Sequence, residues 1–494
     1  MSSKIIPFQL PLPPTVPTIE GNVDYRLLRD QLLLIGRLLE TSGLQAQLLQ
    51  ADREQWLKQC PDASPKDQQI HQRHAHRALR CNIARTLLNE GYRGFAAHLA
   101  DSPLLQNFCG LSTLANPTIP AKSTLQRYAL WWPEEQVRQL IQQLVKTGAD
   151  QPQKLQLEQP LDLALAFLDT TCLATNIHYP VDWVLLRDAT KTLMSALSLI
   201  RQQKLKHRMK APEQFVSQMN RLCLEMNHAN RKFEKGQRSK RKTIFRKIDQ
   251  LVGIVANHAR RYRAILDQQW EQTQWTRPQA EQVLGRIDHV LKLLPQARKQ
   301  ARQRILQGQP PESKDKLLSL YEPDTRVIVR HKPGAEVEFG NTLLLAESQQ
   351  GLIVDWQLFK ESAPADSRLV VASLARMETA FGEVLKGLGT DRGFDSQANR
   401  SALKERAIYD AICPKDPKQL KQRNRSWKFK RLQKRRSQVE PRIAILKNSF
   451  IGQPLRSKGF AHRKLSLSWA VLTHNLWVIA RLSLAEQKAR LKAA

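Results

Sequence analysis

The chain has 494 residues, of which 78 are Lys or Arg and 45 are Asp or Glu, so its formal net charge is +33. A chain of this length has room for about two or three domains, each with its own core. The large positive charge indicates a polyanionic partner, because clustered Lys and Arg gain free energy when phosphates release their counterions. Nucleic acid is the leading partner, and an acidic membrane surface is the weaker alternative.

Cysteines and histidines give little support for a structural metal. The six cysteines are scattered without paired spacing, which argues against structural zinc and against a disulfide framework. The triplet His71, His74 and His76 is interpreted as the solvated surface of a helix, because a metal site needs a closed ligand set.

Two segments bear on targeting and on membranes. Residues 1–23 contain prolines where a secretory signal needs an apolar helix, so we expect a flexible arm and a cytoplasmic protein. The most apolar late stretch, residues 469–482, is short and includes His474 and Asn475. It is therefore predicted to be a packed helix and not a membrane span.

Residues 24–150 show a helical pattern in which leucines recur at three- and four-residue steps and loops are marked by Gly91 and several prolines. Ser123 or Thr124 is predicted to cap one of the helices. The pattern fits a helical N-terminal DNA-binding domain, and it fits any other small helical bundle equally well. The alternatives stay open because helix-turn-helix geometry depends on packing that spacing alone does not show.

The next segments predict a strand and a long insertion. Residues 161–169 form a mostly apolar run with the length of a buried strand, ending at Asp169. Residues 191–320 are strongly helical and basic, and within them residues 231–242 are a dense basic patch. That patch is either a solvated helical face or a phosphate-binding surface.

Beyond residue 325 the pattern alternates between strands and helices. Three β-rich segments separated by glycine-containing turns predict adjacent antiparallel strands, and Asp366 is placed to cap the helix that follows them. A weaker strand ends at Asp391, another covers residues 407–414, and a very basic loop over residues 417–436 precedes two helices and a tail.

Together these elements predict an α/β fold with a mixed-sheet core and an inserted helical domain. The predicted segments are an arm (1–23), a helical N-terminal domain (24–150), a core in two pieces (160–190 and 325–482), the helical insertion after the first strand (191–320) and a C-terminal tail (483–494).

Asp169 and Asp391 share a position, because each follows an apolar strand at a sheet edge where side chains can converge. Convergent carboxylates suit hard divalent cations, and two such ions can promote phosphodiester chemistry. The competing interpretation of any single aspartate is a cap, a turn or a surface ion pair. Asp182 and Asp188 are interpreted in that way, and Asp395 is predicted to cap a helix.

Four segments, residues 168–189, 337–356, 390–399 and 435–450, resemble the successive catalytic blocks of bacterial insertion-sequence transposases of the DDE, ribonuclease-H-like superfamily. The first is the most specific, through the run "IHYPVD". Residues 82–145 resemble the helical domain that precedes the core in such proteins. The resemblance covers most of the chain from residue 70 onward and implies a ribonuclease-H-like catalytic core.

Carried over to this sequence, the resemblance makes Asp169, Asp391 and Glu440 the three catalytic, metal-binding carboxylates. Around the last of them the superfamily often shows a Tyr-Arg-Glu-Lys pattern. Arg436 and Lys447 match its basic positions and are expected to contact phosphates of the transposon end.

Two positions depart from the Tyr-Arg-Glu-Lys pattern. Gln433 stands where the pattern has tyrosine, and Pro441 restricts the backbone of the preceding Glu440.

The basic loop is expected to bind the DNA end through Trp427, Lys428, Lys430 and Arg431, and the aromatic ring either stacks on unpaired bases or anchors the loop.

The function implied is that of a mobile element's DNA transposase, which binds the ends of its insertion sequence, cleaves strands and transfers them. The implied cofactor is Mg²⁺, as two ions with Mn²⁺ as a substitute. The implied partners are double-stranded DNA of the element ends and of the target, and further copies of the chain in a homodimer or larger assembly on DNA. No membrane partner is implied, and the expected location is the cytoplasm with the bacterial nucleoid.

Two other interpretations remain. A catalytically inactive nucleic-acid-binding protein derived from a transposase would keep the basic surface and would lose nothing if Asp169 or Asp391 became Asn. An RNA-binding protein would explain the charge but would give no reason for the acidic blocks, and the aromatic content is only 6%.

Overall fold

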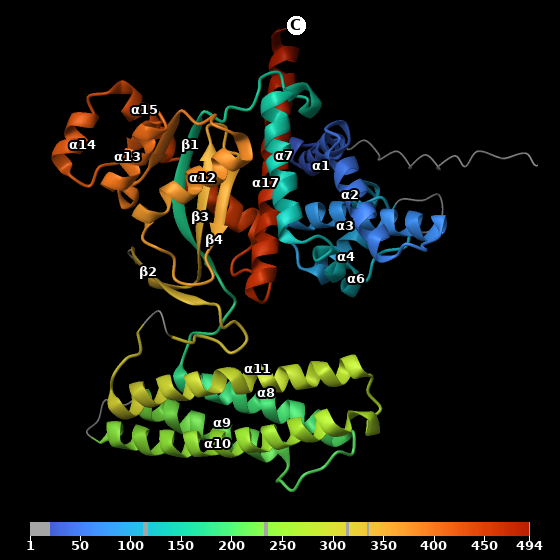
Figure 1. The fold of residues 1–494 in the computed structure, drawn as a ribbon, viewed down its shortest axis with the longest axis vertical. Coiled ribbons are helices and arrows are strands. Elements are labelled where there is room, and N and C mark those ends of the chain that lie inside the picture. Colours follow the sequence, from blue (N-terminus) through green and yellow to red (C-terminus); the bar gives the residue numbers. More distant parts are fainter. Residues whose placement is uncertain (1–19, 112–116, 232–235, 313–315, 333–334, 494) are drawn as a thin grey trace, which may run out of the picture. The chain divides into compact units, whose positions relative to one another are not determined.

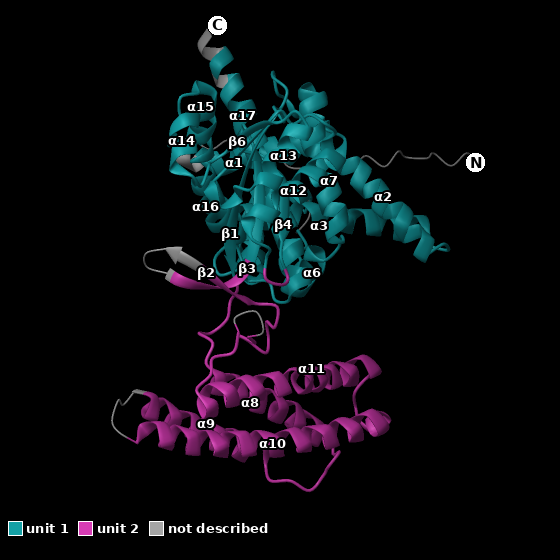
Figure 2. Ribbon diagram, turned by 60° about the vertical axis from the view of Figure 1, so that its left-hand side comes forward, with its two compact units in different colours: residues 1–174, 342–359, 363–494 teal, residues 175–341, 360–362 magenta. Residues whose placement is uncertain are grey.

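The computed structural model describes residues 20–111, 117–231, 236–312, 316–332 and 335–493. Contacts divide the chain into two compact units, which are coloured separately in Figure 2. Unit 1 comprises residues 1–174, 342–359 and 363–494, and unit 2 comprises residues 175–341 and 360–362. Most of the predicted flexible arm, residues 1–19, lies outside the described residues.

Unit 1 combines helices from both ends of the chain with most of a sheet (Figure 1). Its helices are α1 (Val23–Thr41), α2 (Leu44–Gln59), α3 (Pro65–Leu87), α4 (Tyr92–Asp101), α5 (Pro103–Phe108), α6 (Lys122–Ala129), α7 (Glu134–Asp150), α12 (Val370–Phe381), α13 (Gln397–Glu405), α14 (Pro417–Arg423), α15 (Trp427–Arg436), α16 (Val439–Ile445) and α17 (Phe460–Ala493). Short helical turns are η1 (Pro152–Leu155), η5 (Asp366–Arg368), η6 (Arg392–Phe394) and η7 (Leu446–Ile451).

The sheet has six strands in the order β2-β3-β1-β5-β6, with β4 also paired to β3. The strands are β1 (Leu165–Ala174), β2 (Arg326–Lys332), β3 (Ala335–Ser348), β4 (Ile353–Leu358), β5 (Gly387–Thr390) and β6 (Tyr409–Ile412). β1 and β6 both pair with β5 in parallel, whereas β2 and β4 pair with β3 antiparallel. The mixed α/β fold and the antiparallel segment beyond residue 325 are therefore confirmed.

Successive residues of β1 enter different cores, because side chains alternate between the two faces of a strand. Ala166 and Leu168 pack with Leu374 of α12 and Leu403 of α13. Phe167, between them, belongs to a larger core shared with α15, α16, α17 and the N-terminal helices. The sheet is thus covered by helices on both faces. Side chains at even-numbered positions of β1 face one group of helices, and those at odd-numbered positions face the other.

The N-terminal helices do not form a compact unit of their own. α17 packs against α1, α3, α7 and β4, and buried Trp469 meets Trp132 with ring centroids 6.0 Å apart. The predicted packed helix at residues 469–482 is therefore confirmed, and α17 continues through most of the predicted tail to Ala493. Among the described helices, none is long and apolar enough to cross a membrane.

Several local expectations for the N-terminal helices are wrong. His71 is bound by Asp52 at 2.7 Å, and His74 by the Tyr128 hydroxyl at 2.8 Å, so this face of α3 is packed and not simply solvated. Burial holds the pKa of His76 at about 4, so this ring is neutral at pH 7. The cap of α6 is Ala121, without a side-chain hydrogen bond, and so neither of the predicted hydroxyl caps is used.

Unit 2 is built on α8 (Asp182–Gln202), α9 (Pro212–Arg231), α10 (Gln237–Gln269) and α11 (Arg277–Arg302) (Figure 1). The helical turns η2 (Trp270–Gln272) and η3 (Gln303–Gln307) follow α10 and α11. Buried side chains such as Leu193, Phe245 and Ile287 form its core. The bundle begins earlier than residue 191, because Leu186 and Ala189 of α8 already belong to its core.

Asp182, the first residue of α8, has a structural role in unit 2. Its carboxylate accepts a hydrogen bond from Gln300 at 3.0 Å and pairs with Arg304 at 3.2 Å. The interpretation of this aspartate as an ion-pairing group is confirmed.

Candidate active site

Asp169 and Asp391 lie on neighbouring parallel strands. The register pairs Leu168 of β1 with Thr390 of β5, and each aspartate is the next residue of its chain. The pairing therefore brings the two carboxylates side by side on the same face of the sheet.

Two glycines make this register possible. A Cβ atom added to Gly387 would come within 2.7 Å of Leu165, and one added to Gly389 within 2.8 Å of Phe167. Larger residues at these two positions would push β5 away from β1. The two glycines of the sequence Gly-Leu-Gly-Thr-Asp thus let β5 lie close to β1. Asp391 follows at the next position of the sequence that points to the same face as the glycines.

β1 does not end at Asp169, contrary to the prediction. Asp169 is an interior residue, and the strand continues through Thr170 and Thr171 to Ala174. The amide of Thr170 donates to Asp169 Oδ1 at 2.7 Å, and Lys447 Nζ lies 3.2 Å from the Thr171 hydroxyl. The extension of β1 therefore brings a hydroxyl group and a lysine close to the carboxylate.

α15 is fixed to the sheet at two points. Gln433, at the position where the family pattern has tyrosine, donates through Nε2 to the carbonyls of Thr390 (3.1 Å) and Ala411 (2.5 Å). Arg435 is buried and donates to Glu347 at 2.6 Å. These bonds connect α15 with β5, β6 and the end of β3, so the chain that leads to Glu440 starts from a fixed base.

Glu440 is the second residue of α16 and is exposed. Pro441 follows it in the first turn, where a missing N–H costs no intrahelical hydrogen bond. The helix therefore begins at Val439, just before the proline, and Glu440 has helical geometry.

The charges around Asp169 show which groups gather there. Burial and, to a smaller extent, the neighbouring Asp391 carboxylate raise the pKa of Asp169 from 3.8 to about 6. The Thr170 amide and the Arg436 guanidinium oppose this pKa shift, whereas Glu440 adds to it. The three predicted carboxylates and one predicted arginine thus act on one another electrostatically.

Arg436 is half-buried beside these carboxylates. Within the part of the chain that the structure describes, its Nε atom is buried without a hydrogen-bond partner. A guanidinium group with a spare donor beside acidic groups is suited to a phosphate oxygen.

The carboxylates do not form a ready-made metal cage. The described residues contain no group of three or more His, Cys, Asp or Glu side chains arranged to hold a metal ion. The donors nonetheless fit a hard cation, since the two aspartates are adjacent and their mutual repulsion is relieved when a cation lies between them. Glu440 is near enough to raise the pKa of Asp169 but is exposed at the edge of the site.

A comparison with protein families gives a match in this region. Residues 341–476 match the family model described as "Transposase DDE domain". Residues 341–476 are thus similar to a transposase DDE domain, and we refer to them as the DDE domain. The match confirms the resemblance to DDE transposases, and it includes Asp391, Arg436, Glu440 and Lys447, whereas Asp169 precedes it. No curated protein and no solved structure matches the chain.

The DDE domain contains one acidic residue whose place in the site the sequence did not indicate. Asp366 was expected to cap the helix after it, but its Oδ1 instead accepts the Thr170 hydroxyl at 3.1 Å, from the face of β1 opposite to Asp169. Gly393 lies between carboxylates, because an added Cβ there would stand 3.1 Å from both Asp366 Oδ2 and Asp391 Oδ1. Its amide donates to Asp391 Oδ1 at 2.9 Å.

Asp395, also in the DDE domain, is not the cap of α13. Ser396 caps that helix, and Asp395 instead pairs with Arg400 at 2.8 Å and accepts the Lys415 amide at 2.8 Å. A local helix signal predicted the helix correctly but assigned the cap one residue too early.

The predicted basic loop over residues 417–436 is helical, as α14 and α15. Ser426 caps α15, and Trp427 is 70% exposed at its first position. Arg431 lies over the Trp427 ring at 4.8 Å, and Lys428 over the Tyr409 ring at 4.1 Å. Together with exposed Lys430, these side chains form a basic, aromatic surface on the DDE domain.

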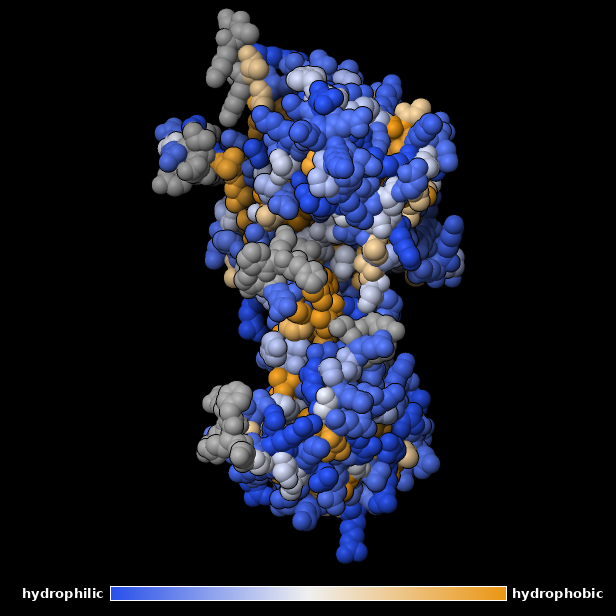
Figure 3. All heavy atoms as spheres, turned by 90° about the vertical axis from the view of Figure 1, so that its left-hand side faces the viewer, coloured by the Kyte–Doolittle hydropathy of each residue, from blue (hydrophilic) through white to orange (hydrophobic). Residues whose placement is uncertain are grey.

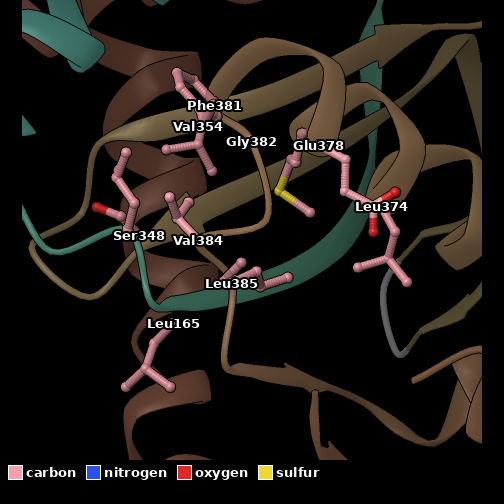
Figure 4. Close-up of a pocket in the computed structure, with 12 residues that line it drawn as sticks. Leu165, Ser348, Val354, Leu374, Glu378, Phe381, Gly382, Val384 and Leu385 are labelled. Atoms are coloured by element: carbon pink, nitrogen blue, oxygen red, sulfur yellow. The ribbon is translucent and has the colours of Figure 1, made fainter. Parts of the chain in front are cut away.

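A small apolar pocket beside α12 is unrelated to the carboxylates (Figure 4). It has a volume of about 20 Å³ and is lined by side chains such as Leu165, Leu374 and Phe381. Its one acidic residue, Glu378, is paired with Arg406 at 2.7 Å. The pocket is large enough for little more than a water molecule.

Proposed function

We propose that the chain is a DNA transposase that binds the ends of its insertion sequence and then cleaves and transfers DNA strands. The observation that carries the proposal is the β1–β5 register, which sets Asp169 beside Asp391 within a chain whose residues 341–476 are similar to a transposase DDE domain. The electrostatic influence of Glu440 and Arg436 on Asp169 supports the assignment of these two residues to the same site.

Asp169, Asp391 and Glu440 are proposed to hold the divalent cations, two Mg²⁺ ions for which Mn²⁺ substitutes. Such ions, when bound, activate the attacking oxygen and stabilise the leaving oxygen of a phosphodiester. The Gly393 amide holds the Asp391 carboxylate in place, and the Thr170 amide does the same for Asp169. Both carboxylates keep one oxygen free of these bonds.

Arg436 and Lys447 are proposed to bind the phosphates beside the reacting one. Arg436 has a spare Nε donor, and Lys447 is oriented by the Thr171 hydroxyl. A positive charge at this place also lowers the pKa of Asp169 and so favours its ionised form at pH 7.

The rest of the chain is proposed to hold DNA around this site. Trp427, Lys428, Lys430 and Arg431 offer an exposed ring among cations, which suits unpaired bases and backbone phosphates at a cut end. The proposal includes a ribonuclease-H-like core, a DNA-binding role for the N-terminal helices, and a homodimer or larger assembly on double-stranded DNA. It places the protein with the bacterial nucleoid.

The test is strand cleavage by the purified chain on DNA that spans the ends of its own element, in Mg²⁺ and in Ca²⁺. Asp169→Asn and Asp391→Asn are expected to lower cleavage and joining by about 10³-fold or more while DNA binding survives. Asp188→Asn is the matched control, because Asp188 belongs to unit 2 and pairs with Arg187. Strong binding without cleavage by any version would favour the inactive, transposase-derived binding protein.

A further inference from the structure

A groove of about 1040 Å³ runs between α9 and α10 of unit 2. Its floor is apolar and includes the buried side chains of Phe215, Leu222 and Leu251. Its rim is polar, and in the view of Figure 3 hydrophilic side chains cover most of this unit's visible surface. The groove therefore combines an apolar floor, which belongs to the bundle core, with long polar side chains above it.

The rim residues come from one face of each helix. On α9, Gln214, Gln218 and Arg221 follow one another at four- and three-residue steps, and on α10 Lys247 and Gln250 are three residues apart. Such steps bring side chains into line along a helix. Two rows of hydrogen-bond donors thus face each other across the groove.

Positive charge predominates on the rim of this groove. Arg208 and Lys210 line the groove from the loop before α9, and they join Arg221 of α9 and Lys247 of α10. Among the described residues, none of these four side chains forms an ion pair or a hydrogen bond, and Glu225 is the acidic residue of the lining. Four like charges around one groove repel one another unless an anion lies between them.

A second groove of the same unit has ion pairs for two of its basic side chains. It has a volume of about 390 Å³ between α10 and α11 and contains Arg298 and Arg302. Asp249 pairs with both arginines, at 2.7 and 2.6 Å, whereas Arg260 and Lys299 also line this groove and form no ion pair among the described residues. Pairing with acidic residues is therefore available to basic residues in this bundle, and the rim of the α9–α10 groove does not use it.

We propose that the α9–α10 groove binds backbone phosphates of double-stranded DNA, as a DNA contact separate from the DDE domain. Arginine, lysine and glutamine side chains are the usual donors to phosphate oxygens. Binding of single-stranded DNA requires exposed aromatic rings on which unpaired bases stack. Apart from His258, the aromatic residue that lines the groove is Phe215, and its ring is buried. The choice of DNA over RNA rests on the proposed function.

The test compares two double variants of the full chain that remove the same charge. Arg221→Ala/Lys247→Ala changes the groove, and Arg286→Ala/Lys292→Ala removes two exposed basic residues of α11 outside it. Binding of a random-sequence DNA duplex of about 30 base pairs is measured by fluorescence anisotropy between about 50 and 200 mM salt. This measurement needs no cleavage, so it is independent of the catalytic site.

The groove variant is expected to raise Kd about 10-fold and to lower the slope of log Kd against log salt by about two, since each lost phosphate contact removes about one. The control is expected to stay within about twofold of the unchanged chain. Equal losses in both variants would overturn the proposal, because they would indicate diffuse charge. A loss confined to an RNA duplex would overturn the choice of DNA. If only the groove variant loses DNA affinity and the unchanged chain never cuts DNA, the groove is a DNA-binding site and the proposed transposase activity is refuted.

Discussion

Arg435 and Arg436 are neighbours in the chain, and the regions around them differ in one respect. The guanidinium of Arg435 is buried and donates to the Glu347 carboxylate and to the carbonyls of Ser348 and Gln349. Arg436 instead lies beside Asp169, with its Nε atom unbonded within the described chain. The first arginine holds α15 against the end of β3, whereas the second retains a donor for another molecule.

The same difference separates two groups of carboxylates in unit 1. Glu347 is paired with Arg435, and Asp355 is paired with Arg376 at 2.7 Å. Asp169 and Asp391 have each other as neighbours, and burial and repulsion raise the pKa of Asp169 to about 6. Charge that the protein satisfies itself stabilises the fold, and charge that it leaves unsatisfied marks a place for a ligand.

The largest expected effect is on folding, from Arg435→Ala. Removing Arg435 leaves the buried Glu347 carboxylate with only the more distant Arg442, whose Nε is 3.8 Å away, so the unfolding free energy should fall by an amount near the lower end of about 3–5 kcal/mol. Urea and thermal denaturation measure the loss. Arg431→Ala, at an exposed position of the same helix, is the control and should change stability by about 0.5 kcal/mol or less. A loss below about 1 kcal/mol for Arg435→Ala would refute the structural role of the pair.

The next effect is on catalysis, from Arg436→Ala. Stability should change little, whereas strand cleavage should fall about 10²–10³-fold, the usual cost of one lost donor to a transition state. The pKa of Asp169 should rise further without the positive charge, so the acid limb of the cleavage profile should move to higher pH. Arg436→Lys should recover part of the rate and of the pH shift. Unchanged cleavage by Arg436→Ala would remove this residue from the site.

A smaller effect concerns pH and the buried helix α17. Burial lowers the pKa of His474 from 6.5 to about 4, so the unfolded chain takes up a proton at this residue before the folded chain does. Stability should therefore be complete above pH 6.5 and should fall as pH drops toward 4, by about 2 kcal/mol at pH 5 at 1.36 kcal/mol per pKa unit. Thermal melting of His474→Gln beside the unchanged chain isolates this contribution. Parallel pH profiles of the two would contradict it.

The smallest effect comes from Gly393→Ala. The new methyl group would lie 3.1 Å from both Asp366 Oδ2 and Asp391 Oδ1, so the carboxylates must shift by a few tenths of an ångström, at a cost of about 1 kcal/mol. Cleavage should fall about 10-fold, because the Asp391 carboxylate is displaced. Gly285→Ala, in helix α11 with no atom within 4 Å of the added Cβ, should instead stabilise the chain by about 0.5–1 kcal/mol. If Gly393→Ala cleaves DNA as well as the unchanged chain, the added methyl group does not displace the Asp391 carboxylate and this prediction is wrong.

The sequence was most informative where a local pattern decides the structure. Short apolar runs predicted the strands on both sides of Asp391, because such a run is a property of a few adjacent residues. It did not predict the end of β1, since Thr170 and Thr171 are polar residues in a strand that faces helices on both sides. The charge of residues 417–436 indicated a loop, yet Asp416 and Ser426 cap two helices there.

Contacts between distant segments were beyond the sequence. Arg435 meets Glu347 and Thr170 meets Asp366 across long stretches of chain, and a single sequence does not pair such positions. The joining of the N-terminal helices with the C-terminal region in one unit was equally hidden, because it depends on contacts that α17 makes with α1, α3 and α7. The positions of Asp169, Asp391 and Glu440 in the proposed site came from resemblance, and the strand register supplies the physical reason for the first two.

The central claim is that the carboxylates beside Arg436 gather a divalent cation, and Mn²⁺ binding followed by electron paramagnetic resonance tests it most directly. The measurement uses the full chain on end DNA and does not depend on cleavage. Protein-bound manganese is expected in the unchanged chain and in Asp188→Asn, and it should be lost in Asp169→Asn/Asp391→Asn. Equal manganese binding by all three proteins would contradict the account.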